Sequence, residues 1–176
     1  MNTSDDLKIS TPTDREVVVT RTFDAPRTLV FDAYTQPDLL RRWYGAPGRS
    51  LVICEVDLRV GGAYHFLWRG EGRKDVGMRG VHREVARPER LVRTERWADW
   101  DAGEIIETVT FIEHEGRTVL TSTGLYPSRE VRDAVLQAGL ENGTRETFGR
   151  LADELGKMQR SRAVGTIRDS TSINTG

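Results

Sequence analysis

Residues 128–158 have the sequence SREVRDAVLQAGLENGTRETFGRLADELGKM and show helical period. Ser128 is a suitable N-cap residue, because its hydroxyl can accept a hydrogen bond from a free amide of the first turn. The helical pattern that follows, from Val131 to Met158, spans about 28 residues, which corresponds to ~42 Å of helix. One helix of this length can cross an entire sheet. The apolar positions are Val131, Ala134, Val135, Ala138, Leu140, Phe148, Leu151 and Leu155.

Seven segments upstream of this helix have the alternation or the β-branched composition of strands. Short connections that contain Gly, Pro or Asp separate the last six, so consecutive strands there are expected to run antiparallel. Two short helices are predicted after the first strand, because Pro26 and Pro37 each precede apolar residues at helical spacing. The predicted strands are 16–23, 50–58, 63–70, 75–85, 90–97, 104–112 and 117–123.

The element order β-α-α, six strands and a final helix predicts an α+β domain. An antiparallel sheet of about seven strands needs a cover on only one face, and the long C-terminal helix supplies it. A sheet that wraps such a helix must curve, and glycines such as Gly77 and Gly80 suit bends and bulges. The sequence therefore predicts a curved sheet around a helix, with an internal cavity between them.

The length of 176 residues suits one domain, which we place at 15–158. The flanking segments 1–14 and 159–176 are rich in small polar residues and are predicted to be disordered tails. Because 26 Lys and Arg balance 27 Asp and Glu, we expect no nucleic-acid partner. The chain lacks an apolar run of ~20 residues, so we expect no membrane insertion.

Cys54 is the single cysteine, and the N-terminus lacks the basic and apolar pattern of a signal peptide, so we expect a cytoplasmic protein. The three histidines are widely spaced and give no pair at metal-ligand spacing, so we expect no metal and no cofactor. No nucleophile elbow, P-loop or dinucleotide fingerprint is present in the sequence. Any specificity must therefore come from a local site.

Three aromatic residues, Tyr64, Phe66 and Trp68, alternate and so share one face of their strand. They either pack as core or line a small-molecule pocket, in which polar tips at one end of an apolar wall would orient the ligand. The register of the next hairpin decides what they meet. The expected pairs are Trp68 with Met78, Phe66 with Gly80 and Tyr64 with His82.

The strand 90–97 places Arg93, Glu95 and Trp97 on one face. If this face points inward, burial raises the pKa of Glu95 unless a cation such as Arg93 pairs with it. Glu95 is then a candidate polar anchor for a ligand, and the alternative is a solvated ion pair on an edge strand. No catalytic residue is assigned, but His82 and Glu95 are the candidates for acid–base chemistry.

Gly139 and Gly143 lie four residues apart in the predicted C-terminal helix, where each costs roughly 0.5–1 kcal/mol relative to alanine. Either the helix approaches the sheet closely there or the missing side chains leave space for a ligand. Aromatic residues at three further places either rim the cavity or anchor helix to sheet. They are Trp43-Tyr44, Trp97 with Trp100, and Tyr126.

Short motifs in a characteristic order carry a family resemblance. They are Phe23-Asp24-Ala25-Pro26 with Val30-Phe31 and Tyr34; Arg42-Trp43-Tyr44-Gly45; Asp57-Leu58-Arg59-Val60-Gly61-Gly62; Pro88-Glu89-Arg90-Leu91-Val92; and Gly139-Leu140-Glu141-Asn142-Gly143. From Glu16 to Met158 the chain resembles bacterial relatives of the activator of Hsp90 ATPase, in the START-like or Bet v 1-like (SRPBCC) superfamily. The resemblance implies a helix-grip fold with a hydrophobic pocket, in a superfamily whose members bind lipids, hormones or polyketides. Thr144 stands where the resemblance leads us to expect a bulky aromatic residue.

We therefore expect a protein that binds a small, largely hydrophobic molecule between sheet and helix, as a monomer or weak homodimer. One alternative is a chaperone-linked protein–protein adaptor, with a protein partner. The other is a cofactor-free cyclase or dehydratase acting on a polyketide or another cyclic substrate. The predicted ligand-binding residues are Trp43, Tyr64, Phe66, Trp68, Met78, His82, Glu95, Trp97, Tyr126, Val135, Gly139 and Gly143.

Overall fold

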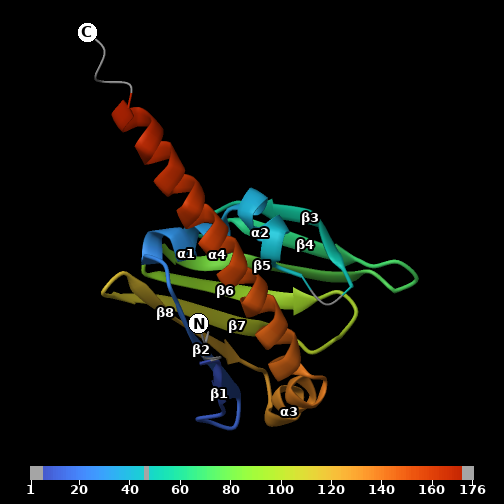
Figure 1. Cartoon of the computed structure of the whole chain (residues 1–176). Coiled ribbons are helices and arrows are strands. Elements are labelled where there is room, and N and C mark those ends of the chain that lie inside the picture. Colours follow the sequence, from blue (N-terminus) through green and yellow to red (C-terminus); the bar gives the residue numbers. More distant parts are fainter. Residues whose placement is uncertain (1–5, 46–47, 172–176) are drawn as a thin grey trace.

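The computed structural model describes residues 6–45 and 48–171, with the backbone alone for 166–171. In this part of the chain eight strands form one antiparallel sheet, and a long helix crosses one face of it (Figure 1). The predicted α+β helix-grip architecture is thereby confirmed. The elements are β1 (Lys8–Ser10), β2 (Glu16–Phe23), α1 (Arg27–Thr35), α2 (Pro37–Trp43), β3 (Ser50–Val56), β4 (Ala63–Arg69), β5 (Val76–Ala86), β6 (Arg90–Trp97), β7 (Ile105–His114), β8 (Arg117–Leu125), α3 (Arg129–Gln137) and α4 (Leu140–Thr171).

The strands lie in the order β1-β2-β8-β7-β6-β5-β4-β3, a meander from β3 to β8 extended by β2 and β1. Strand β1 is additional to the seven predicted strands and lies in the segment predicted to be a tail. Its Ile9 pairs with Val19 and packs against the core. Three residues held by the edge of β2 are too few to show a strand pattern in the sequence.

The register between β4 and β5 differs from the predicted one by two residues. The observed register brings Arg69 and Asp75 together across the connection, with 2.8 Å between Nη2 and Oδ2. A shift of two residues keeps every side chain on its predicted face but changes its partner. The observed pairs are Trp68 with Val76, Phe66 with Met78 and Tyr64 with Gly80.

Gly80 lets a side chain of β4 reach across β5 to β6. A β-carbon at this position would overlap the Thr94 carbonyl oxygen and the Tyr64 ring. The Tyr64 hydroxyl donates to that Thr94 oxygen at 2.6 Å. Three consecutive strands are thereby joined by one buried tyrosine, which only a glycine at position 80 permits.

The single long helix predicted from Ser128 to Met158 is instead two helices, α3 and α4. The Ser128 hydroxyl accepts from the Val131 amide at 3.3 Å, as expected of its N-cap. Gly139 adopts φ of +93°, a conformation that ends α3 and that other residues rarely adopt. Helix α4 then continues to Thr171, through the segment that the sequence predicts to be a tail.

The middle of α4 fills part of the space that the curved sheet encloses. Phe148, Leu151 and Leu155 are buried there, and the Phe148 ring lies 5.8 Å from that of Phe23 in an edge-to-face arrangement. Helices α1 and α2 complete this part of the core, because the Trp43 indole nitrogen donates to the Ala33 carbonyl oxygen at 2.9 Å. The part of this space that α3 and the first turns of α4 cover is not filled by side chains and forms a hollow.

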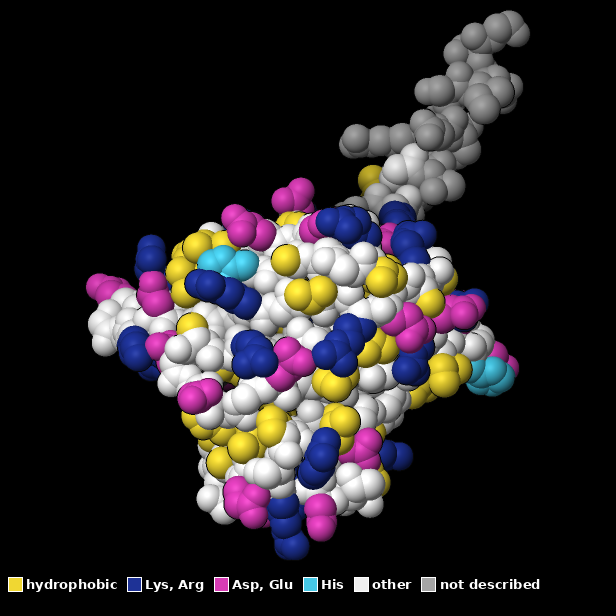
Figure 2. Space-filling model, turned by 180° about the vertical axis from the view of Figure 1, so that it is seen from behind, with side chains coloured by type: hydrophobic (Ala, Val, Ile, Leu, Met, Phe, Trp, Pro, Cys, Tyr) yellow, Lys and Arg dark blue, Asp and Glu magenta, His cyan; other side chains and the backbone are white. Residues whose placement is uncertain are grey.

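The face of the molecule opposite α4 carries basic and acidic side chains next to one another, with hydrophobic ones between them (Figure 2). Exposed ion pairs of the sheet, such as Arg83 with Glu104 at 2.9 Å, contribute little to stability. The charges of this face are mixed in sign. The hollow under α3 and α4 lies on the other side of the sheet.

Replacing Gly139 with alanine should lower the free energy of unfolding by about 1–2 kcal/mol, because a β-carbon is unfavourable at positive φ. The matched change Gly149→Ala, inside α4 with open space around the added carbon, should raise it by about 0.5–1 kcal/mol. Urea unfolding measures both values. If Gly139→Ala stabilises the protein as Gly149→Ala does, α3 and α4 form one continuous helix in solution.

Candidate functional site

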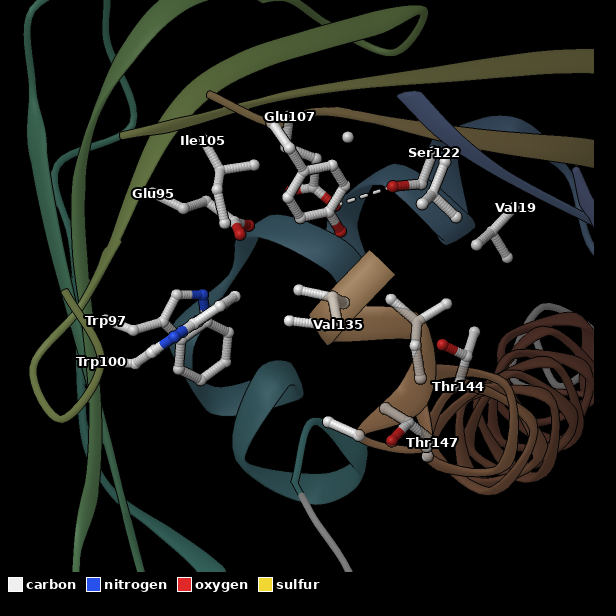
Figure 3. Close-up of a pocket in the computed structure, with 18 of the residues that line it drawn as sticks. Val19, Glu95, Trp97, Trp100, Ile105, Glu107, Ser122, Val135, Thr144 and Thr147 are labelled. Carbon is white, nitrogen blue, oxygen red and sulfur yellow. Dashed lines mark hydrogen bonds between the residues drawn. The ribbon is translucent and has the colours of Figure 1, made fainter. Parts of the chain in front are cut away.

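A pocket of about 830 Å³ lies between the sheet and the two C-terminal helices (Figure 3). Its volume is within the range of sites for small molecules and cofactors. Aromatic residues from several elements form much of the wall, and Trp100, which is 38% exposed, lies at its opening. The aromatic lining residues are Tyr34, Tyr44, Trp97, Trp100, Tyr126 and Phe148, and the polar ones include Glu95, Glu107, Ser122, Thr144 and Thr147.

The structure brings together only part of the predicted ligand-binding set. Trp68 lines a smaller hollow of about 180 Å³, whose lining also includes Tyr44, Trp97 and Gly143. Contact of these residues with a ligand remains a prediction. The predicted residues that line the main pocket are Glu95, Trp97, Tyr126, Val135, Gly139 and Gly143, and those that do not are Trp43, Tyr64, Phe66, Trp68, Met78 and His82.

The aromatic row of β4 is core because Tyr44 covers it. The Tyr44 ring lies 5.5 Å from that of Phe66 and 5.3 Å from the Trp68 ring, edge to face in both cases. Tyr44 itself presents its other side to the pocket. Of the two interpretations left open for Tyr64 and Phe66, the structure therefore favours core packing.

His82 is buried behind the pocket wall. Its ring lies 5.4 Å from the Tyr64 ring, and neither ring nitrogen has a hydrogen-bond partner within the described residues. Burial first, and then the charge of Arg93, lowers the pKa of His82 to about 4. His82 is therefore neutral at physiological pH, and its position gives it no contact with a molecule in the pocket.

Arg93 is the buried cation of the site. It lies directly opposite Glu107 in the β6–β7 register, and its Nε is 2.7 Å from Glu107 Oε2. The guanidinium also lies over the ring of Tyr64 at 5.0 Å and over that of Tyr34 at 5.8 Å. Packing between aromatic faces and a carboxylate compensates this cation for its lost hydration.

Glu107 receives two further hydrogen bonds at its other oxygen. The Ser122 hydroxyl donates to Oε1 at 2.9 Å, the bond drawn in Figure 3, and the Tyr34 hydroxyl donates to it at 3.3 Å. With Arg93 this makes three donors from three different elements. The Glu107 carboxyl group is thereby held in a fixed position.

Glu95 faces the pocket with far less support. Its Oε1 lies 3.6 Å from Arg93 Nη2, which is too long for a hydrogen bond. Burial, followed by the charge of Glu107, raises the pKa of Glu95 to about 8, and Arg93 opposes this only in part. Glu95 is therefore mostly protonated at neutral pH, and of its two possible orientations the structure has the inward one.

Sequence reasoning missed Glu107, Ser122, Tyr34 and Thr147 among the lining residues. A signal for Glu107 existed, because one charged residue interrupts an apolar set with a period of two in the strand 104–112. Ser122 and Thr147 carry no such signal, since small hydroxyl residues are common on either face. The inward set of β7 is Ile105, Glu107, Val109 and Phe111.

A curved antiparallel sheet wrapped around a C-terminal helix, with a pocket between them, defines the helix-grip class of START-like proteins. A sequence model of the family described as Activator of Hsp90 ATPase homolog 1-like protein matches residues 24–156, and the chain belongs to this family. The resemblance that the short motifs carry is thereby confirmed. No curated protein matches the chain.

Solved structures from several organisms share the fold. A crystal structure of a protein from Rhodobacter sphaeroides is 26% identical, with a TM-score of 0.82, over 86% of this chain and 99% of that chain. A protein from Mycobacterium smegmatis is 25% identical, with a TM-score of 0.74, over 84% and 94% of the two chains. An HSP90 activator from Plasmodium falciparum is 23% identical, with a TM-score of 0.60, over 81% and 96%, a likeness that shows the fold alone.

Two further features of the described residues bear on the site. They contain no group of three or more His, Cys, Asp or Glu side chains that could hold a metal ion. None of the helices within 6–45 and 48–171 is both long enough and apolar enough to cross a membrane. The lining of the pocket supplies two carboxyl groups, hydroxyl groups and aromatic rings.

The raised pKa of Glu95 predicts a loss of stability as the pH rises. Between its ordinary range and about 8, the folded protein keeps a proton that the unfolded chain releases, so the free energy of unfolding should fall by up to ~1.4 kcal/mol per pH unit. Glu95→Gln should remove most of this slope, as measured by urea unfolding from about pH 5 to about pH 9. The control Glu84→Gln, at an exposed ion pair with Arg90, should keep it. A slope that persists in Glu95→Gln would assign the proton to another group.

Proposed function

We propose that this protein binds a small, largely hydrophobic molecule in the pocket between the sheet and helices α3 and α4. The observation that carries the proposal is the pocket itself, with about 830 Å³ of space inside a lining of mostly aromatic and aliphatic side chains. Close-packed protein interiors leave few voids larger than a water molecule. A hollow of this size is therefore best explained by a guest molecule whose apolar surface it buries.

The sequence of α4 supports a hollow that is built in. Where the helix covers the pocket it presents Gly143, Thr144 and Thr147, which are small. Only a few residues later it presents buried leucines that fill the core. A β-carbon at Gly143 would meet nothing within 4 Å, so the space next to this glycine is open. Of the two interpretations of Gly143, open space for a ligand is the one supported.

We further propose that the protein acts in the cytoplasm without a cofactor, as a monomer or weak homodimer. The single cysteine, Cys54, is a buried free thiol, and this absence of disulfide chemistry supports the location. Apolar burial needs no cofactor, because the hydrophobic effect supplies the driving force and the few polar groups supply orientation.

Filling the pocket from α4 tests the proposal. Gly143→Leu should place an apolar side chain in the pocket and weaken binding of a hydrophobic ligand at least about tenfold, since overpacking costs about 1–3 kcal/mol. The matched control is Gly149→Leu, in the same helix with open space around it and outside the pocket lining. Native mass spectrometry of the freshly purified proteins should find a co-purified molecule with the wild type and with Gly149→Leu. Equal retention by Gly143→Leu would contradict binding in this pocket.

A second candidate function, activation of a chaperone ATPase, is favoured by the family description and by the fold shared with the Plasmodium falciparum HSP90 activator. The same pair of variants separates it from ligand binding. Adding the wild type to an Hsp90-class chaperone and measuring ATP hydrolysis tests for an adaptor. Stimulation that Gly143→Leu and Gly149→Leu share equally would favour this second function, because it would not need the pocket.

A further inference from the structure

The pocket wall contains two carboxyl groups on neighbouring strands, Glu95 on β6 and Glu107 on β7. Figure 3 shows both pointing into the hollow toward Val135 of α3. Their side chains are 13% and 12% exposed, so both lie in a largely dehydrated wall. Within the described part of the chain the lining contains no Lys, Arg or His, and the nearby positive charge is that of Arg93 behind the wall.

One buried guanidinium cannot neutralise two buried carboxylates. The distances show which of the two carboxyl groups Arg93 pairs with. Arg93 lies opposite Glu107 in the strand register and contacts it at 2.7 Å, whereas its distance to Glu95 is 3.6 Å. The hydroxyl groups of Ser122 and Tyr34 also donate to Glu107. Glu107 is thus the fixed anion of the pair, and Glu95 is left with no such set of donors.

The tyrosine hydroxyl groups around Glu95 add no charge to this part of the pocket wall. Tyr44 from the end of α2 and Tyr126 after β8 both line the pocket, and burial raises the pKa of each hydroxyl far above neutrality. They are therefore uncharged, and so are Tyr34 and Tyr64, whose pKa values are raised by the same cause. The pKa of about 8 for Glu95 agrees with the geometry, with burial as its largest cause.

We infer that Glu95 is the specificity-determining residue of the pocket, and that its uncharged carboxyl group donates a hydrogen bond to a neutral oxygen, such as a ketone carbonyl, of an otherwise apolar ligand. This inference rests on the proposed ligand-binding function. An anionic head group is disfavoured, because two carboxyl groups already line this wall and the buried Arg93 contacts Glu107. A cationic head group is disfavoured as well, because Glu95 would have to lose its proton to pair with it, and the desolvation of both charges opposes formation of a buried ion pair.

Four probes with one ring system and different head groups test the inference: acetylnaphthalene (a ketone), ethylnaphthalene (no polar group), naphthoate (an anion) and naphthylmethylammonium (a cation). Isothermal titration calorimetry near pH 6 should show acetylnaphthalene binding about tenfold tighter than ethylnaphthalene, and the two ions binding more weakly. As the pH rises above about 8, the advantage of the ketone should disappear.

Two substitutions at Glu95 separate donation by the side chain from mere polarity. Glu95→Leu removes the donor, so acetylnaphthalene and ethylnaphthalene should bind with equal affinity at every pH. Glu95→Gln replaces the acid with an amide that cannot ionise, so the advantage of the ketone should become independent of pH. The exposed Glu84→Gln should behave like the wild type, and circular dichroism should confirm that each variant is folded.

The outcomes distinguish this inference from the proposed function. If ethylnaphthalene binds and Gly143→Leu blocks it, but the ketone has no advantage, the ligand-binding function stands and the role of Glu95 is wrong. Tightest binding of naphthylmethylammonium, with affinity rising with pH, would show that Glu95 acts as a carboxylate and would overturn the inference. Tightest binding of naphthoate would do the same. Failure of all four probes to bind would overturn both.

Discussion

The buried guanidinium of Arg93 is the charge on which the other properties of the site depend. It lies behind the pocket wall at 3% side-chain exposure and is compensated by Glu107 and by aromatic faces. Its charge helps to keep His82 neutral, and its pairing with Glu107 leaves Glu95 to be protonated. Because burying a cation without partners is costly, the strand register, the rings around it and the state of both carboxyl groups are linked.

The division of the grip into a filled part and a hollow part follows from one helix. Phe148, Leu151 and Leu155 of α4 fill the space next to α1 and α2, and the turns before them carry a glycine and two threonines. The break at Gly139 turns α3 away from the axis of α4, so the two helices cover the pocket without filling it (Figure 1). The residues of α4 that stabilise the core are thus different from the residues that leave the pocket open.

Periodicity was sufficient to predict the fold, because long alternating and helical patterns report which faces are buried. The pattern placed Arg93, Glu95 and Trp97 on one face of β6 but left open whether that face points inward. The β4–β5 register did not follow from the pattern, because a shift of two residues keeps every side chain on the same face and so leaves the alternation unchanged. The sequence also left open whether Phe66 packs as core, since Tyr44, whose ring packs against it, comes from another part of the sequence.

The shared fold does not determine what the pocket accepts, because one fold supports many functions. The determining features are local: a pocket wall without basic side chains in the part that the structure describes, one fixed anion and one acid that remains protonated. A lipid-like anion requires a free cation in the wall, and the charge of Arg93 is already balanced by Glu107. A neutral ligand needs no further charge in the wall, because the proton of Glu95, which lies beside Glu107, can be donated to a ligand oxygen. The electrostatics of β6 and β7 therefore restrict the ligand class more closely than family membership does.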